Sequence, residues 1–294
     1  MGIYMSDKII RLTAANAAIR AFVADTRQTV QTAFDRHKTS PVMTAALGRT
    51  LTAAAMMGVM QKNDSDLLTI QISGDGPAGK ITVTANAKGE VKGFASEPLV
   101  LIPLKPNGKL DVSGAIGNGT LTVIKDLGLK EPYTGTTTLV SGEIAEDITY
   151  YFVASEQVPS SVGLGVLVDT DYSVRQAGGF IVQLMPFAED SVIDRLEANL
   201  ASISSVTTML EEGMSPMDIA NKILDGFDIE VVGESEPSFK CNCSRERVHN
   251  ALSTLNKNEI KSMIADGDSV NVHCDFCNTD YEFTVSQLKD ILES

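Results

Sequence analysis

Alternating apolar and polar residues dominate the first 185 positions of the chain and predict strands. Two such runs, 8–13 and 18–23, flank a short polar turn, which is the pattern of a β-hairpin. Further strand-like runs follow at 67–73, 80–85, 91–95, 119–125, 165–169 and 178–185. This alternation is typical of mainly antiparallel sheets with helices packed on them.

Helical patterns interrupt the strands at 26–38, 42–62 and 144–155. The second begins after Ser40-Pro41, a combination favoured at a helix start. It is apolar nearly all round, but its uninterrupted apolar run is only about ten residues, whereas a bilayer span needs ~20. We therefore expect a buried core helix and no membrane partner.

The charge distribution separates residues 190–239 from the rest. Residues 1–189 carry 18 acids against 16 bases, whereas 190–239 carry 11 acids and only two bases. Apolar residues at helical spacing predict an amphipathic helix over 191–203, with Ile193 and Leu196 on its buried face, and another starting at Ser215-Pro216. Helices this short depend on docking against a neighbour. We expect 233–238 to be a flexible joint.

All four cysteines follow residue 240, in two close pairs with 30 residues between them: Cys241 and Cys243, then Cys274 and Cys277. Two such pairs can close a tetrahedral shell of four sulfurs around one Zn²⁺. The adjoining His273 could be a fifth candidate ligand, but four thiolates already complete the shell. If oxidised, the same thiols could instead form two disulfides and release the metal.

Two other uses of these cysteines fit less well. A thioredoxin-like site places its first cysteine at a helix N-terminus, whereas Cys274 follows the strand-like run 269–273. An extracellular disulfide scaffold is disfavoured because the chain is long, poor in cysteine and shows no signal-peptide pattern. We therefore expect a reducing cytoplasm.

Two glycine motifs resemble nucleotide-binding loops without meeting their requirements. Gly74 to Lys80 matches the first seven positions of a P-loop, but Ile81 follows and a strand-like run replaces the helix, so we expect a hairpin loop and no ATP binding. The glycines of 114–119 have the wrong order for a dinucleotide fingerprint and predict a turn.

Catalytic and nucleic-acid functions find little support. Glu143, Glu146 and Asp147 could pair as acid and base, but we expect them in the first turn of a helix, where carboxylates complement the helix dipole. No stretch carries the basic stripe of a nucleic-acid-binding protein. We expect no catalytic residues, no enzyme activity and no organic cofactor.

Together these patterns predict an α+β chain in three parts. The parts are an N-terminal domain of mainly antiparallel sheets with packed helices (1–189), an acidic helical linker (190–239) and a small zinc module (240–294).

Several stretches resemble one known family in the right order along the chain. They are 45–52, 74–77, 140–147, 155–157 with Pro159, 178–179, 239–247 and 272–278 with Tyr281 and Phe283. The family is heat-shock protein 33, the redox-regulated holdase chaperones, and the resemblance covers essentially the whole chain.

The resemblance implies a bacterial cytoplasmic chaperone that is inactive while reduced and zinc-bound. Oxidants would join Cys241 to Cys243 and Cys274 to Cys277, releasing zinc, unfolding the module and loosening the linker. The protein would then form a dimer and hold unfolding client proteins without ATP. The alternative from another class is a constitutive zinc-stabilised binding or assembly protein whose metal never leaves.

Overall fold

The structure is a computed structural model that describes residues 6–186 and 188–293. It divides into two compact units, a large one that ends at Lys240 and a small one that begins at Cys241. Both mix helices with antiparallel strands, so the predicted α+β class is confirmed.

The large unit contains two sheets. The first is antiparallel in the order β10-β1-β2-β9-β8. The second has the order β11-β5-β4-β3-β6-β7 and is antiparallel except for the pair β11–β5. Their strands are β1 Lys8–Ala14, β2 Ile19–Asp25, β3 Leu67–Gly74, β4 Lys80–Asn86, β5 Glu90–Ala95, β6 Gly119–Asp126, β7 Tyr133–Thr138, β8 Ser160–Val168, β9 Val174–Leu184, β10 Ile229–Ser235 and β11 Ser238–Phe239.

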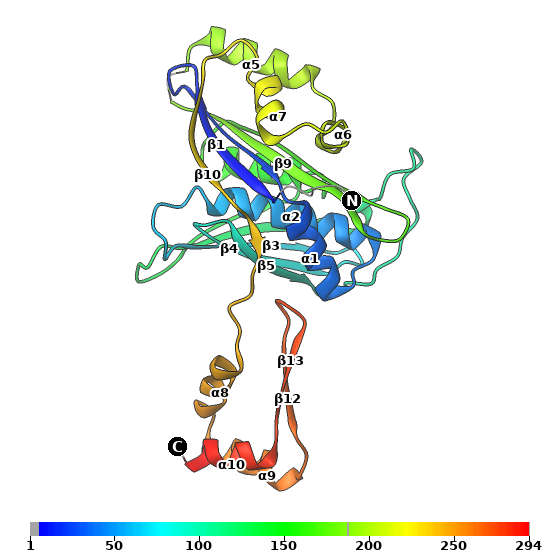
Figure 1. Cartoon of the computed structure of the whole chain (residues 1–294), viewed down its shortest axis with the longest axis vertical. Coiled ribbons are helices and arrows are strands. Elements are labelled where there is room, and N and C mark those ends of the chain that lie inside the picture. The colour runs from blue at the N-terminus through cyan, green and yellow to red at the C-terminus, as the bar shows by residue number, and fades with distance from the viewer. Residues whose placement is uncertain (1–5, 187, 294) are drawn as a thin grey trace. The chain divides into compact units, whose positions relative to one another are not determined.

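A buried helix lies between the two sheets (Figure 1). This helix, α2 (Pro41–Gly58), begins where the Ser40 side chain accepts a hydrogen bond from the Met43 N–H, and nearly all of its residues are buried. The same layer contains α1 (Arg27–His37), α3 (Val112–Ile116) and α4 (Ala145–Ala154). Since α2 contacts strands of both sheets, it organises the main core, as its all-round apolar pattern predicts.

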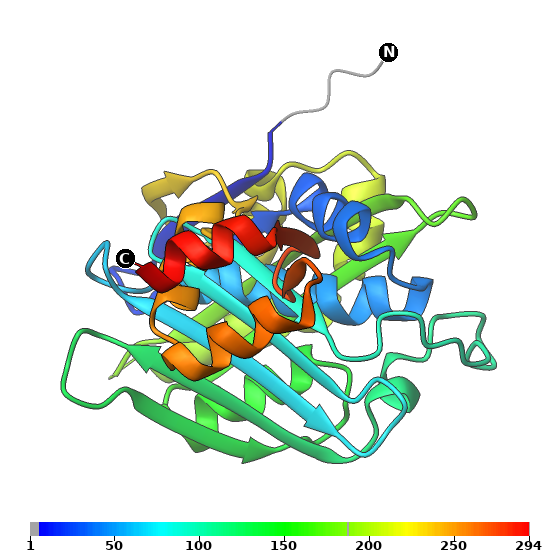
Figure 2. The same ribbon diagram turned by 90° about the horizontal axis from the view of Figure 1, so that it is seen from below.

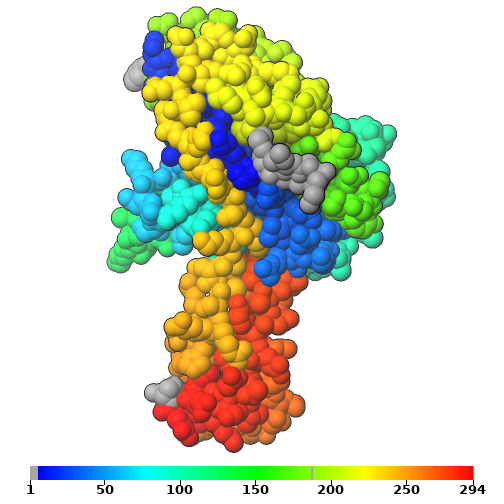
Figure 3. Space-filling model, in the orientation of Figure 1, coloured from blue at the N-terminus to red at the C-terminus, as the bar shows by residue number. Residues whose placement is uncertain are grey.

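Three acidic helices cover the other face of the first sheet: α5 (Asp190–Ser202), α6 (Val206–Glu211) and α7 (Pro216–Ile223). Their apolar side chains form a second core with Ile10, Leu12 and Phe180 of the sheet. In Figure 3 the yellow surface of these helices lies beside the blue strand β1. The predicted buried face of α5 was half right, because Leu196 is buried in this core whereas Ile193 is partly exposed and outside it.

The predicted flexible joint at 233–238 was wrong. β10 pairs along β1, from Ile9 with Ser235 to Ala14 with Ile229. β11 then pairs in parallel with β5, and Lys240 forms an ion pair with Glu90 (2.5 Å). Backbone hydrogen bonds therefore tie this acidic segment to both sheets, although its side chains are mostly exposed and give little apolar pattern.

The two glycine motifs pack against each other. Gly74 to Lys80 is the β3–β4 hairpin loop, as predicted. Its Gly76 N–H donates to the carbonyl of Ile116 (2.9 Å), where α3 ends, and a Cβ at Gly74 would lie only 1.9 Å from the same oxygen. Both motifs therefore serve close backbone packing.

The three acids occupy different environments. Glu143 precedes α4 and forms ion pairs with Arg49 (2.7 Å) and Lys105, so placing it in the first helical turn was wrong. Burial raises the pKa of Glu143, but the hydrogen bonds from these two cations outweigh burial and lower it to about 2. Glu146 and Asp147 are in the first turn of α4, and buried Asp147 accepts the N–H of Ile144 (2.9 Å).

The small unit contains a hairpin and three helices. The hairpin joins β12 (Val270–Cys274) to β13 (Thr279–Phe283), and the helices are α8 (Arg245–Ser253), α9 (Lys257–Asp266) and α10 (Val285–Glu293). Figure 2 shows α9 and α10 (orange and red) side by side. Among residues 241–293, only five apolar residues apart from Cys277 are buried, namely Leu252, Ile260, Phe283, Leu288 and Ile291. Within the described ranges, no helix has the length and apolar character to cross a bilayer.

Candidate metal centre

The four cysteines enter the small unit on two backbone segments. Cys241 and Cys243 lie in the irregular stretch before α8, whose first turn is capped by the Ser244 side chain. Cys274 ends β12, and Cys277 lies in the turn that leads to β13. In that turn the N–H groups of Cys277 and Asn278 both donate to the Cys274 carbonyl (3.2 and 2.8 Å), which brings both thiols to one side.

The structure gathers all four sulfurs into one cluster. Every Sγ lies within 4.8 Å of the others, with Cys241 to Cys274 at 3.8 Å and Cys243 to Cys277 at 3.3 Å. Four sulfurs bound tetrahedrally at ~2.3 Å from a zinc ion would be ~3.8 Å apart. The cluster therefore has the dimensions of a four-thiolate metal site.

The thiols perturb one another because they are close. Burial and the neighbouring cysteines raise the pKa of Cys274 to about 12, and the pKa of Cys241 is also raised. Burial likewise raises the pKa of Cys243, but hydrogen bonds from Tyr281 and the other thiols outweigh it and lower this pKa to about 7. The raised pKa values of Cys241 and Cys274 oppose deprotonation of these two thiols, and a bound divalent cation would favour their thiolates.

Tyr281 is a contributor that sequence reasoning did not assign to the site. Its hydroxyl donates to Cys243 Sγ (3.1 Å), and this bond raises the pKa of Tyr281 to about 12. Tyr281 pairs across the hairpin with Val272. The alternation of β13 could have indicated that Tyr281 and the turn cysteines share a region, but not which sulfur the hydroxyl meets.

His273 lies outside the cluster. Its Nδ1 contacts Asp280 Oδ1 (2.8 Å), the residue opposite it in the hairpin, and the possible ligand group in the described chain contains the four cysteines alone. The expectation that the four thiols form the ligand group without His273 agrees with this arrangement. Four sulfur donors leave no open coordination position, which is typical of a structural and not a catalytic zinc site.

The fold and the site define a two-unit α+β protein whose small unit is built around a metal-compatible cluster of four thiols. A family model described as Hsp33 protein matches residues 7–284. The chain belongs to this family of chaperones.

Individual relatives are similar to this chain over nearly the full length of both sequences. The chain is 57% identical to the 33 kDa chaperonin of Agathobacter rectalis over 98% of this chain and 100% of the relative. It is 52% identical to that of Clostridioides difficile, over 98% and 99%. The crystal structure of the 33 kDa chaperonin (heat shock protein 33 homolog) from Thermotoga maritima superimposes with a TM-score of 0.90 at 37% identity, covering 98% of both chains.

Proposed function

We propose that this chaperone is a redox-regulated holdase that is inactive while its four thiols are reduced and bind one Zn²⁺ per chain. The observation that carries the proposal is the four-sulfur cluster in a unit with very little apolar core. Cys241, Cys243, Cys274 and Cys277 would be the metal ligands. When bound, zinc would supply the charge that holds all four sulfurs as thiolates.

Oxidation would convert the thiols into two disulfides, Cys241–Cys243 and Cys274–Cys277. For each disulfide, two thiolates, two protons and one hydrogen peroxide give one sulfur–sulfur bond and two waters, so a chain consumes two peroxides. The shorter sulfur distances run between the two pairs, but every sulfur lies within 4.8 Å of every other, so proximity allows either pairing. The neighbour pairing rests on the family resemblance and calls for disulfide mapping.

Exchanging zinc for disulfides should unfold the small unit. Structural zinc contributes ~10–16 kcal/mol to the folding of small zinc modules. Disulfides that close loops of a few residues contribute only about 2 kcal/mol each on the loop-entropy estimate. Five buried apolar residues beside Cys277 offer little compensation.

Loosening of the linker would then expose the surface that binds clients. Helices α5 to α7 cover an apolar sheet face that includes Ile10, Leu12 and Phe180. Under this proposal residues 1–189 bind unfolding proteins, 190–239 form the metastable cover and 240–294 form the sensor. The active form would be a dimer in the bacterial cytoplasm and would need no ATP, because holding a client requires no chemical step.

The test compares reduced and peroxide-treated protein in an aggregation assay with a thermolabile client, with zinc release measured alongside. Oxidation with mild heating should release one zinc, consume four thiols and switch on suppression, and added ATP should change nothing. Equal suppression by both forms, with zinc retained, would instead support a constitutive zinc-stabilised binding protein.

A further inference from the structure

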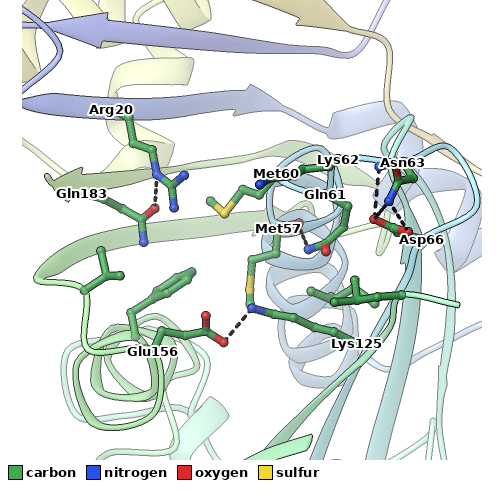
Figure 4. A pocket seen from close by; sticks show the side chains of 14 residues that line it. Arg20, Met57, Met60, Gln61, Lys62, Asn63, Asp66, Lys125, Glu156 and Gln183 are labelled. Atoms are coloured by element: carbon green, nitrogen blue, oxygen red, sulfur yellow. Dashed lines mark hydrogen bonds and ion pairs between the residues drawn. The ribbon is translucent and has the colours of Figure 1, made fainter. Parts of the chain in front are cut away.

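A cavity of about 330 Å³ lies in the large unit, and none of the four cysteines lines it (Figure 4). Strands of both sheets contribute to its wall, with Arg20 from β2, Gln183 from β9 and Lys125 from β6. Residues at or just after the carboxyl ends of α2 and α4 complete it. The volume falls in the range of about 300–1,000 Å³ that small-molecule sites occupy.

Arg20 points into this cavity in a fixed orientation (Figure 4). Its Nε donates to Gln183 Oε1 (2.7 Å), the residue directly opposite it on β9. Gln183 is fully buried, and its Nε2 in turn donates to Ser160 Oγ (2.9 Å). Within the described chain, the terminal amino groups of Arg20 have no hydrogen-bond acceptor, so the guanidinium presents two oriented donors to the cavity.

The acids that line the cavity already have partners. Glu156 accepts from Lys125 Nζ (2.6 Å) and from the Tyr151 hydroxyl, while it makes no ion pair with Arg20. Asp66 accepts from the backbone and side chain of Asn63 (3.1 and 3.2 Å). Partial burial lowers the pKa of Arg20 although the nearby Glu156 carboxylate raises it, and no carboxylate lies within ion-pair distance of the guanidinium in the described chain. The terminal amino groups of Arg20 could therefore bind an anionic hydrogen-bond acceptor in the cavity.

The rest of the wall restricts what kind of anion fits. Apolar groups of Met57, Met60, Leu68 and Phe152 face the cavity. The lining contains three cations, Arg20, Lys62 and Lys125, and two acids, Asp66 and Glu156, so its net charge of one positive suits an anion with a single charge better than a doubly charged one such as phosphate. A planar carboxylate matches the guanidinium fork, and a flexible apolar body matches methionine side chains.

We propose that this cavity binds a small monocarboxylate with an apolar body, whose carboxylate pairs with Arg20 and whose body lies against Met57, Met60 and Phe152. No step of the thiol switch uses these residues. The site is therefore independent of the proposed redox regulation.

The first experiment uses octanoate as the probe on the reduced, full-length protein with ¹³C-labelled methionine methyl groups. Octanoate should shift the methyl signals of Met57 and Met60 saturably, with a Kd on the order of 1 mM or tighter. Met209, a buried residue of the linker helix α6, should not shift. No saturable shift at Met57 or Met60 would overturn the proposal without any variant.

The second experiment tests charge recognition. Octan-1-ol should bind roughly tenfold more weakly than octanoate, because it lacks the charge that pairs with the guanidinium. Arg20→Gln should remove most of that difference, while Arg36→Gln, a change at an exposed residue of α1, should preserve it. Equal binding of acid and alcohol by the wild type, or an unchanged preference in Arg20→Gln, would exclude Arg20 as the carboxylate-binding group.

Discussion

Cys243 differs from the other three cysteines because its sulfur accepts a hydrogen bond from the Tyr281 hydroxyl. Tyr281 donates to its sulfur at 3.1 Å, whereas Cys274 has a pKa raised to about 12 by burial and neighbouring thiols. Groups that hydrogen-bond to metal ligands tune metal affinity. Tyr281 should therefore affect zinc binding without touching the metal.

Tyr281→Phe should weaken zinc binding by about tenfold, because the Cys243 thiolate loses its hydrogen bond. The pKa of Cys243, about 7, should rise. Protons then compete better at neutral pH, so the loss should be larger at pH 7 than at pH 9. Competition with a chromogenic chelator at both pH values measures it.

The matched control is Tyr150→Phe, which removes an exposed hydroxyl in the large unit. It should leave zinc affinity unchanged at both pH values. If Tyr281→Phe matches the wild type throughout, the hydrogen bond has no role in the metal centre.

The sequence predicted the cysteine cluster well because ligand spacing is local in each pair. It did not predict the partners of individual atoms. His273 adjoins Cys274 in sequence, but strand alternation directs its ring to Asp280, and Glu143 precedes its helix to meet Arg49 and Lys105. Such contacts depend on packing between distant segments.

At the scale of an element, α5 packs on the second core through one apolar stripe, and it forms side-chain hydrogen bonds to backbone carbonyls at the end of α7. Leu196 is buried and Leu200 packs partly against the same core. The Asn199 side chain donates to the carbonyls of Ile223 and Asp225 (3.1 and 3.0 Å). Because such a helix is unstable alone, removing apolar contact should detach it.

Leu196→Ala with Leu200→Ala should give a zinc-loaded, reduced protein with appreciable holdase activity. Truncating a buried leucine costs ~2–5 kcal/mol, which is large for a short docked helix but does not affect the metal site. Aggregation suppression and zinc content should be measured together.

Ile193→Ala is the control on the same helix, since Ile193 lies outside the second core. It should remain inactive until oxidised. A double variant with an undocked, protease-sensitive helix that still fails to suppress aggregation would show that uncovering the sheet is insufficient.

Several elements with strong periodicity were predicted, whereas strands defined by pairing were missed, and the helices α8 to α10 of the small unit were not predicted either. The hairpin of β1 and β2, helix α2 and helix α4 follow clear patterns. β7 is a polar edge strand and β10 an acidic, exposed one, so neither shows an apolar alternation. Register with a distant strand defines them, and a single sequence does not reveal that register.

At the scale of the whole molecule, the proposed switch requires loss of the small unit's fold to be communicated to the linker. The chain offers a direct route, because Cys241 follows β10 and β11 along the backbone. β10 buries little side-chain surface. It should therefore detach readily when the small unit unfolds.

Cys274→Ser should separate metal loss from thiol oxidation. The variant should lose zinc in reducing buffer, and its small unit should unfold because the metal organises it. Trypsin should then cut at Arg195 and Lys222 in the linker, while the fragment spanning 8–184 persists on mass spectrometry.

Asp275→Asn, an exposed change beside the same cysteine, should keep both zinc and protease resistance. A zinc-free Cys274→Ser protein with an uncut linker would mean that the metal centre and the cover are not coupled.

The pairing of β1 with β10 also bears on how the chain is made. Ile9 needs Ser235 to complete its sheet, and β2 needs β9. At about 5–20 residues per second, ribosomal synthesis leaves roughly 10–40 s between the emergence of β1 and of its partner. Helices α5 to α7, which cover the apolar face of this sheet, are also made long after β1 and β2. The proposed client-binding face is therefore uncovered on the nascent chain until α5 to α7 have been synthesised.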